Sequence, residues 1–224
     1  MSESTSAAPQ PSQSVPSRRR VASSLAWAVP TVVAAAAAPA EAASPPPRID
    51  RVFSVGLAST AVDGTSVSAC GSTSTRLSVT TDNVNTYYRI VNVQAGSTVT
   101  DVTASILVQK SVVDAMGSQN PLTWTNTTTT DWSNPTREVS GTTPAVYTNN
   151  DIQYYRYYST LKTAVPAPAS GTITLPRIGW YSNCSTTLAQ STGVLVNGRG
   201  SAVVNGTPLV NVGTYVRLTP RPAG

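Results

Sequence analysis

A two-residue alternation of apolar and polar side chains constrains this chain most strongly, and it is clearest over residues 99–110. The apolar positions that share one face are Val102, Ala104, Ile106 and Val108, and the polar positions opposite are Asp101, Thr103, Ser105 and Gln109. Leu107 breaks the pattern once. A strand with one buried side has this period, whereas a helix repeats every 3.6 residues. The segment is therefore predicted to be a half-buried β-strand.

Shorter runs of the same kind recur along the chain, separated by Gly, Pro, Asn and Ser. The predicted inward-facing positions are Leu77, Val79, Ile173 and Leu175, with Phe53, Val55 and Leu57 in an opening strand. Asn197-Gly198 and Asn205-Gly206 predict two-residue hairpin turns, because both residue types accept a positive φ. These turns would separate short strands within 194–210, and residues 214–218 would supply the last strand. Residues 117–150 are rich in Thr, Asn and Ser, which predicts a long loop or an edge hairpin.

Two cysteines, Cys70 and Cys184, are present in a chain without histidine. Two thiols alone make a poor zinc site, so we expect them to form a disulfide that ties an early strand to a late one. Many short strands with one long-range bridge favour an all-β fold, a two-sheet sandwich of immunoglobulin-like type, with a β-barrel as the alternative. Ser182 stands where immunoglobulin domains place a tyrosine, so the likeness is one of architecture only.

The N-terminal segment has the order of an export signal. Arg18, Arg19 and Arg20 precede an uncharged run over residues 21–38, and Ala40 and Ala42 are the small residues that a signal peptidase reads. Ser17-Arg18-Arg19-Arg20-Val21 resembles the twin-arginine signals of exported bacterial proteins, and the alanine-rich run after Pro30 resembles secreted proteins of the high-GC Gram-positive actinobacteria. Ala22 and Ser23 depart from that pattern, so the general secretory route stays open.

The signal sets the predicted domain limits. Residues 1–42 are predicted to be a cleaved signal, residues 43–48 a Pro-rich spacer, and residues 49–224 one β-sandwich domain. Retention of residues 21–38 as a membrane anchor is the alternative, because the run is nearly long enough to cross a bilayer. Its many alanines and Pro30 make it only weakly apolar, which favours cleavage. The expected location is extracellular or at the cell surface.

Charge and composition exclude several function classes. The net charge of +5 is mild, and arginines in the predicted mature part are scattered, unlike the basic patch of a nucleic-acid binder. The absence of histidine removes the usual general base and the commonest metal ligand. Oxygen-rich loops at 82–85 and 149–151 lack the spacing of a calcium loop. We therefore expect no enzyme activity, no metal and no cofactor, with Glu138 and an aspartate as the minority alternative for glycoside hydrolysis.

An aromatic run at residues 154–158 is the most suggestive candidate site. In a strand, two of its tyrosines always face away from the core, and tyrosine combines apolar area with a polar tip suited to sugars or proteins. The candidate binding residues are Tyr154, Tyr155, Arg156, Tyr157, Tyr158, Trp124, Trp132, Trp180 and Tyr181. Cross-strand packing of these rings is the competing interpretation. The predicted function is a secreted, non-enzymatic binding, adhesion or structural domain, with cell-wall polysaccharide or an extracellular protein as partner and carbohydrate binding as the specific alternative.

Overall fold

Four antiparallel sheets dominate the computed structural model, which describes residues 44–58, 70–71, 73–165, 169 and 171–219. The predicted export signal, including its arginines and its cleavage site, lies outside the described residues, as does most of 166–170. Residues 44–47 precede the first strand and have no regular structure. Within the described residues none of the sheets closes into a barrel, and the all-β sandwich expected from the alternation is confirmed.

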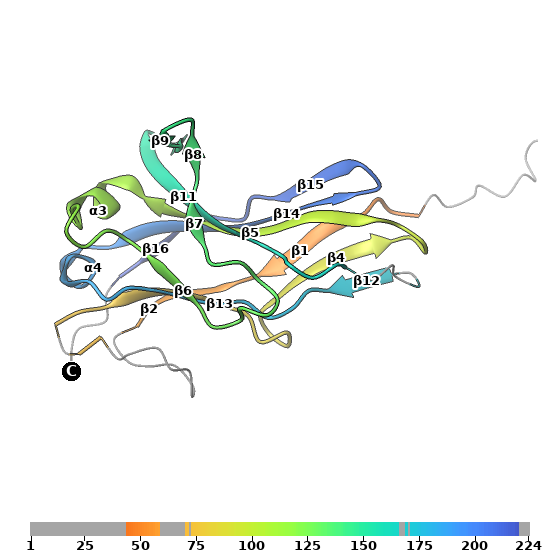
Figure 1. The fold of residues 1–224 in the computed structure, drawn as a ribbon, viewed down its shortest axis with the longest axis horizontal. Coiled ribbons are helices and arrows are strands. Elements are labelled where there is room, and N and C mark those ends of the chain that lie inside the picture. The colour runs from red at the N-terminus through yellow and green to blue at the C-terminus, as the bar shows by residue number, and fades with distance from the viewer. Residues whose placement is uncertain (1–43, 59–69, 72, 166–168, 170, 220–224) are drawn as a thin grey trace, which may run out of the picture. The chain divides into compact units, whose positions relative to one another are not determined.

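The largest sheet forms one layer of the sandwich. Its central path runs β10–β11–β5–β14–β15, with β16 pairing with β14 and β7 pairing with β11. These strands are β5 (Val99–Gln109), β7 (Thr136–Arg137), β10 (Val146–Asn149), β11 (Ile152–Thr160), β14 (Val194–Val204), β15 (Thr207–Asn211) and β16 (Val216–Leu218). The long central strands β5, β11 and β14 span this layer in Figure 1.

The opposite layer contains two smaller sheets. One has the order β1–β4–β12, formed by β1 (Arg48–Val52), β4 (Tyr87–Val93) and β12 (Gly171–Thr174). The other has the order β2–β3–β13–β6, formed by β2 (Ser54–Ala58), β3 (Arg76–Thr80), β13 (Gly179–Ser182) and β6 (Trp124–Asn126). The chain passes from β1 to β2 through Phe53 alone, and Figure 1 shows both sheets on the same side of the large sheet.

The remaining elements are short. A two-stranded hairpin is formed by β8 (Val139–Ser140) and β9 (Thr143–Pro144), and two helices, α3 (Lys110–Ala115) and α4 (Thr186–Gln190), lie together at one end of the sandwich (Figure 1). Residues 117–150, predicted to be a long loop or an edge hairpin, contain β6 to β10 together with connecting loops. In the part of the chain that the structure describes, helices are too short or too polar to span a membrane.

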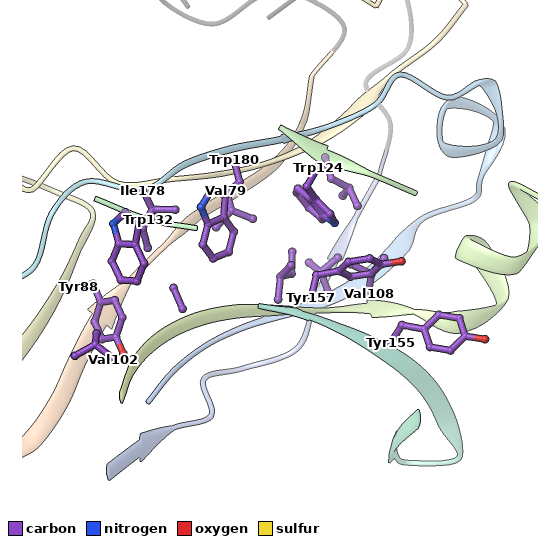
Figure 2. Close-up of a cluster of buried hydrophobic side chains, with 14 of the residues drawn as sticks. Val79, Tyr88, Val102, Val108, Trp124, Trp132, Tyr155, Tyr157, Ile178 and Trp180 are labelled. Atoms are coloured by element: carbon purple, nitrogen blue, oxygen red, sulfur yellow. The ribbon is translucent and has the colours of Figure 1, made fainter. Parts of the chain in front are cut away.

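The core lies between the two layers and is rich in aromatic rings. Trp132 and Trp180 are completely buried, and Figure 2 shows their rings together with that of Trp124 between the strands of the two layers. Aliphatic side chains predicted to face inward complete this cluster, namely Leu77, Val79, Val102, Ile106 and Val108. Burial of this much apolar area is the main term that stabilises the fold, at about 25 cal/mol per Å².

The predicted faces of β5 are confirmed, and one irregularity modifies them. Val102 and Ala104 are buried in the core, whereas Asp101 is exposed on the outer face of the large sheet. Thr103 pairs with Ser201, but Thr100 pairs with Val203, so two residues of β5 oppose one residue of β14. This is a β-bulge, and it turns Thr100 and Asp101 outward in succession.

Tyr88 of β4 supports this bulge from the opposite layer. Its hydroxyl lies 2.9 Å from the carbonyl oxygen of Thr103 and 2.8 Å from that of Ser201, and it donates its proton to them. Burial raises the pKa of Tyr88, so the hydroxyl remains a donor. A Cβ at Gly200 would lie 2.8 Å from the Tyr88 ring, so the close approach requires glycine.

The two predicted hairpin turns have different outcomes. Asn205 and Gly206 have φ of 49° and 78° and connect β14 to β15, as predicted. Asn197 and Gly198 instead lie inside β14, so that prediction is wrong. Gly198 faces the core, where a Cβ would meet Phe53 at 3.0 Å. The glycine is needed for this close approach and not for a turn.

The disulfide between Cys70 and Cys184 forms as predicted. It lies beside the bridge that joins Thr75 to Ser185, at the start of β3 and the end of β13. Cys70 precedes β3 and Cys184 follows β13, and these strands are neighbours in one sheet, so the bond joins chain segments that flank adjacent strands of the same layer. In immunoglobulin domains the bond crosses between the two sheets, so the resemblance is limited to the layered antiparallel architecture.

Candidate functional site

Most of the aromatic residues predicted to form a binding surface are buried. Seven of the nine candidates are less than a tenth exposed: Trp124, Trp132, Tyr154, Tyr155, Tyr157, Trp180 and Tyr181. Arg156 and Tyr158 are half-buried and reach the surface. The expectation of an exposed aromatic surface is wrong for these seven, because burying a large apolar ring in the core is more favourable than leaving it in water.

The alternation predicted for residues 154–158 holds in β11. Tyr155 and Tyr157 share the inner face, where Tyr157 packs against Trp124 with ring centroids 5.8 Å apart. Burial raises the pKa of Tyr157 to about 12. Arg156 and Tyr158 lie on the outer face, opposite Leu107 and Ser105 of β5. The outer face of the large sheet is therefore the place to look for a site.

One half of this outer face is covered by its own side chains. Tyr154 packs against Tyr215 with ring centroids 4.9 Å apart, and the Tyr215 hydroxyl accepts a hydrogen bond of 2.9 Å from Arg199. Arg199 also donates to Asn197 at 2.8 Å. Leu107, which breaks the alternation of β5, lies between Arg156 and Asn197 and is completely buried. The aromatic side chains that cover this half of the outer face thus explain why an apolar residue, Leu107, can lie there.

The other half of the face is open and forms a groove of about 390 Å³. The groove crosses β11, β5, β14 and β15, which at a strand spacing of about 4.8 Å makes it roughly 14 Å across. Its lining residues are Asp101, Thr103, Glu138, Arg156, Tyr158, Ser201, Ala202, Val203, Pro208, Leu209 and Val210. One wall is therefore polar and aromatic, whereas the β15 wall is aliphatic. Val210 is 66 % exposed.

An ion pair organises the polar wall of the groove. Arg156 Nη1 lies 3.3 Å from Glu138 Oε1, and Tyr147 donates a hydrogen bond of 2.5 Å to Glu138 Oε2. The guanidinium of Arg156 also lies over the ring of Tyr158, 5.5 Å from its centroid. The backbone N–H of Glu138 donates to the carbonyl of Arg156 at 2.8 Å, which fixes the two residues to each other. The Tyr158 ring is thereby held in place before any ligand arrives.

A second hollow, of about 560 Å³, lies between α3 and the β10–β11 turn. Its lining is largely polar, and two of its three charged residues, Lys110 and Asp114, form an ion pair with each other. Lys110 Nζ lies 2.5 Å from Asp114 Oδ2, and Tyr155 donates to the same carboxylate at 3.0 Å. The hydrogen bond from Lys110 lowers the pKa of Asp114. This hollow has neither an exposed aromatic ring nor an aliphatic wall among its lining residues, so it is the weaker candidate for a binding site.

The two oxygen-rich loops have structural roles. Asp82 Oδ1 accepts hydrogen bonds of 2.8–2.9 Å from the backbone N–H groups of Val84, Asn85 and Thr86, and these bonds lower the pKa of Asp82 to about 2. Asn150 and Asp151 have positive φ and form the turn between β10 and β11. Among the described residues, no group of three or more acidic, cysteine or histidine side chains is placed to hold a metal ion.

Several groove residues were not among the sequence-based candidates. Thr103, Ser201, Pro208 and Val210 carry no recognisable motif, and only the strand register brings them together. The alternation of β5 did place Asp101 and Thr103 on a polar face, which was the one available signal. Comparisons with known protein families, curated proteins and solved structures find no match to this chain.

Proposed function

We propose that this chain is an exported, non-enzymatic β-sandwich module that binds a polysaccharide in the groove of its large sheet. The observation that carries this proposal is the pairing of a held aromatic ring with hydroxyl and carboxylate groups in one open groove. A sugar ring presents an apolar C–H face and a rim of hydroxyls. Tyr158 offers the matching ring, and Thr103, Ser201 and Glu138 offer hydrogen-bonding groups beside it.

Replacement of Tyr158 tests the proposal. The Tyr158→Ala variant is expected to bind insoluble cell-wall polysaccharide about thirtyfold more weakly, because truncation of a central aromatic anchor costs about 2 kcal/mol. Retention in a pull-down assay and the dissociation constant for soluble fragments measure the effect. Tyr87→Ala is the matched control, since Tyr87 is also half-buried and also carries an arginine over its ring, with Arg89 4.0 Å from the centroid.

Two outcomes would count against glycan binding in the groove. Equal retention of both variants would place the contact elsewhere, and binding of an extracellular protein without any glycan would change the ligand class. The Tyr158→Phe variant guards against misfolding as the cause, because it keeps the ring and loses only the hydroxyl.

Export is part of the proposal and has its own measurement. Its support is the N-terminal resemblance to twin-arginine signals of actinobacterial secreted proteins, together with a disulfide, which persists in oxidising compartments. We expect the intact mass of protein from culture medium to begin at Ala43 and to increase by two hydrogens on reduction. A full-length species found only in membranes would contradict cleavage and favour a retained anchor.

Glycoside hydrolysis is the second candidate, because the groove contains two carboxylates, Asp101 and Glu138. Both oxygens of Glu138 already accept hydrogen bonds, from Arg156 and Tyr147. The Glu138 carboxylate thus holds Arg156 and Tyr147 in place, which favours a positioning role in the groove. Release of reducing sugar ends from a bound polysaccharide, abolished by Glu138→Gln, would favour the enzyme over the binding module.

A further inference from the structure

Asp101 carries the unbalanced charge of the groove. Of the three charged residues that line it, Glu138 and Arg156 form an ion pair with each other. Asp101 is exposed, and its carboxylate accepts one hydrogen bond, of 3.1 Å, from the hydroxyl of Thr100. Within the described residues Asp101 makes no ion pair. The groove therefore contains one negative charge without a cation, in a chain whose net charge is +5.

The backbone presents this carboxylate in an unusual way. Asp101 has a φ of 51°, in the left-handed region, at the first position of the β5 bulge. Glycine is common at such a position, and aspartate is one of the few other residues that tolerate it. The bulge directs the side chain to the same face as Thr103 and Ser201. Tyr88 fixes the bulge from behind through the two carbonyl groups on either side.

We propose that the groove selects a polysaccharide that carries free amino groups, with Asp101 as the residue that recognises them. This inference rests on the proposed function, since it names the class of glycan bound in the same groove. A protonated amine on the sugar would supply the cation that Asp101 lacks, by a charge-assisted hydrogen bond. An anionic wall polymer would bring a second negative charge beside Asp101 and is disfavoured.

Arg199 is another cation on this face, two residue pairs along β14 from Ser201. Its guanidinium is directed to Asn197 and Tyr215, on the covered half of the face. Arg156 is engaged by Glu138. At physiological salt the Debye length is about 8 Å, so charges on more distant parts of the surface have little effect on the groove.

The test compares two soluble probes of equal length, a β-1,4-linked oligomer of glucosamine and the same oligomer with every amine acetylated. At a pH below the pKa of the sugar amines and at low salt, the wild-type protein is expected to bind the amine form about fivefold more tightly, the upper range for an exposed ion pair. This preference is expected to fade as salt is raised. In Asp101→Asn the preference is expected to disappear, because asparagine keeps the shape and the left-handed backbone but loses the charge.

Asp151→Asn is the matched control, since Asp151 is also exposed and has a φ of 61°, but lies in the β10–β11 turn outside the groove. It is expected to keep the preference. Asp101→Gly, which suits the bulge even better, removes the side chain and is expected to behave like Asp101→Asn.

Three results would overturn the inference. Equal affinity of the wild-type protein for the two probes would do so, as would a preference that survives Asp101→Asn, or tighter binding of polygalacturonic acid than of the amine oligomer. In each case binding that is still lost in Tyr158→Ala leaves the proposed function standing. Absence of binding to any glycan would instead remove the proposed function and this inference together.

Discussion

Replacing Cys70 and Cys184 with alanine is expected to lower the free energy of unfolding by about 4–5 kcal/mol in the chain-entropy model. The bond closes a loop over a sequence separation of 114, and such a long loop restricts the unfolded chain strongly. The folded state keeps the neighbouring hydrogen bonds, because Thr75 and Ser185 exchange backbone bonds of 3.1 and 2.8 Å beside the bridge. Urea denaturation of the oxidised wild-type protein and the double variant measures the difference.

Ser185→Ala provides a control at the same place in the fold. Its side chain caps α4 by accepting a hydrogen bond of 3.3 Å from the backbone of Leu188, and loss of such a cap costs about 1 kcal/mol. The double cysteine variant should therefore lose several times more than Ser185→Ala, while its near-UV circular dichroism stays close to that of the wild type. A loss no larger than that of the control would contradict the entropic account.

Trp132→Ala is expected to cost about 3–5 kcal/mol, the range for removing a large buried aromatic side chain. Trp132 is completely buried, lies parallel to the ring of Tyr88 at 6.2 Å, and donates its indole N–H to the carbonyl of Pro176 at 3.3 Å. The ring stacks on the residue that supports the β5 bulge (Figure 2), so its loss also removes one of the two aromatic contacts of Tyr88 and leaves only that with Phe53. Urea denaturation measures the cost.

A comparison with Trp180 separates the effect of losing ring volume from the effect of losing the hydrogen bond. It is as buried as Trp132, but its indole N–H makes no hydrogen bond within the described residues. Trp132→Phe is expected to lower the free energy of unfolding by about 1 kcal/mol more than Trp180→Phe does, because only Trp132→Phe leaves the carbonyl of Pro176 without its donor. Equal costs for the two phenylalanine variants would assign the whole effect to packing.

The fold class could be predicted from sequence because side-chain alternation is a local property of a strand. The inward positions Val102 and Ile106 and the turn at Asn205 and Gly206 follow from their immediate neighbours alone. The pair Asn197 and Gly198 has the same local signature but lies inside β14, where Gly198 allows the close approach of Phe53, a residue between β1 and β2 that is far away in the sequence. Such a contact cannot be read from neighbouring residues.

The site could be predicted only in part for the same reason. The alternation of β11 correctly predicts that Tyr157 and Tyr158 lie on opposite faces of the sheet, so that one of them faces outward. Which outer tyrosine remains accessible depends on Tyr215, which covers Tyr154 from the far end of the chain. The pairing of Glu138 with Arg156 likewise depends on how the irregular segment around β7 and β8 packs against β11.

The contact between Tyr88 and the bulge limits how the shape of the groove can change by substitution. The floor of the groove is tied to the opposite layer, because a side chain at Gly200 would collide with the Tyr88 ring, and loss of the phenol would free the carbonyls at Thr103 and Ser201. On the β15 rim, by contrast, the side chain of Val210 makes no such contact within the described residues and is largely exposed. Substitutions on the rim therefore alter the groove at little cost in folding free energy, whereas the floor changes only through coordinated replacement in both layers.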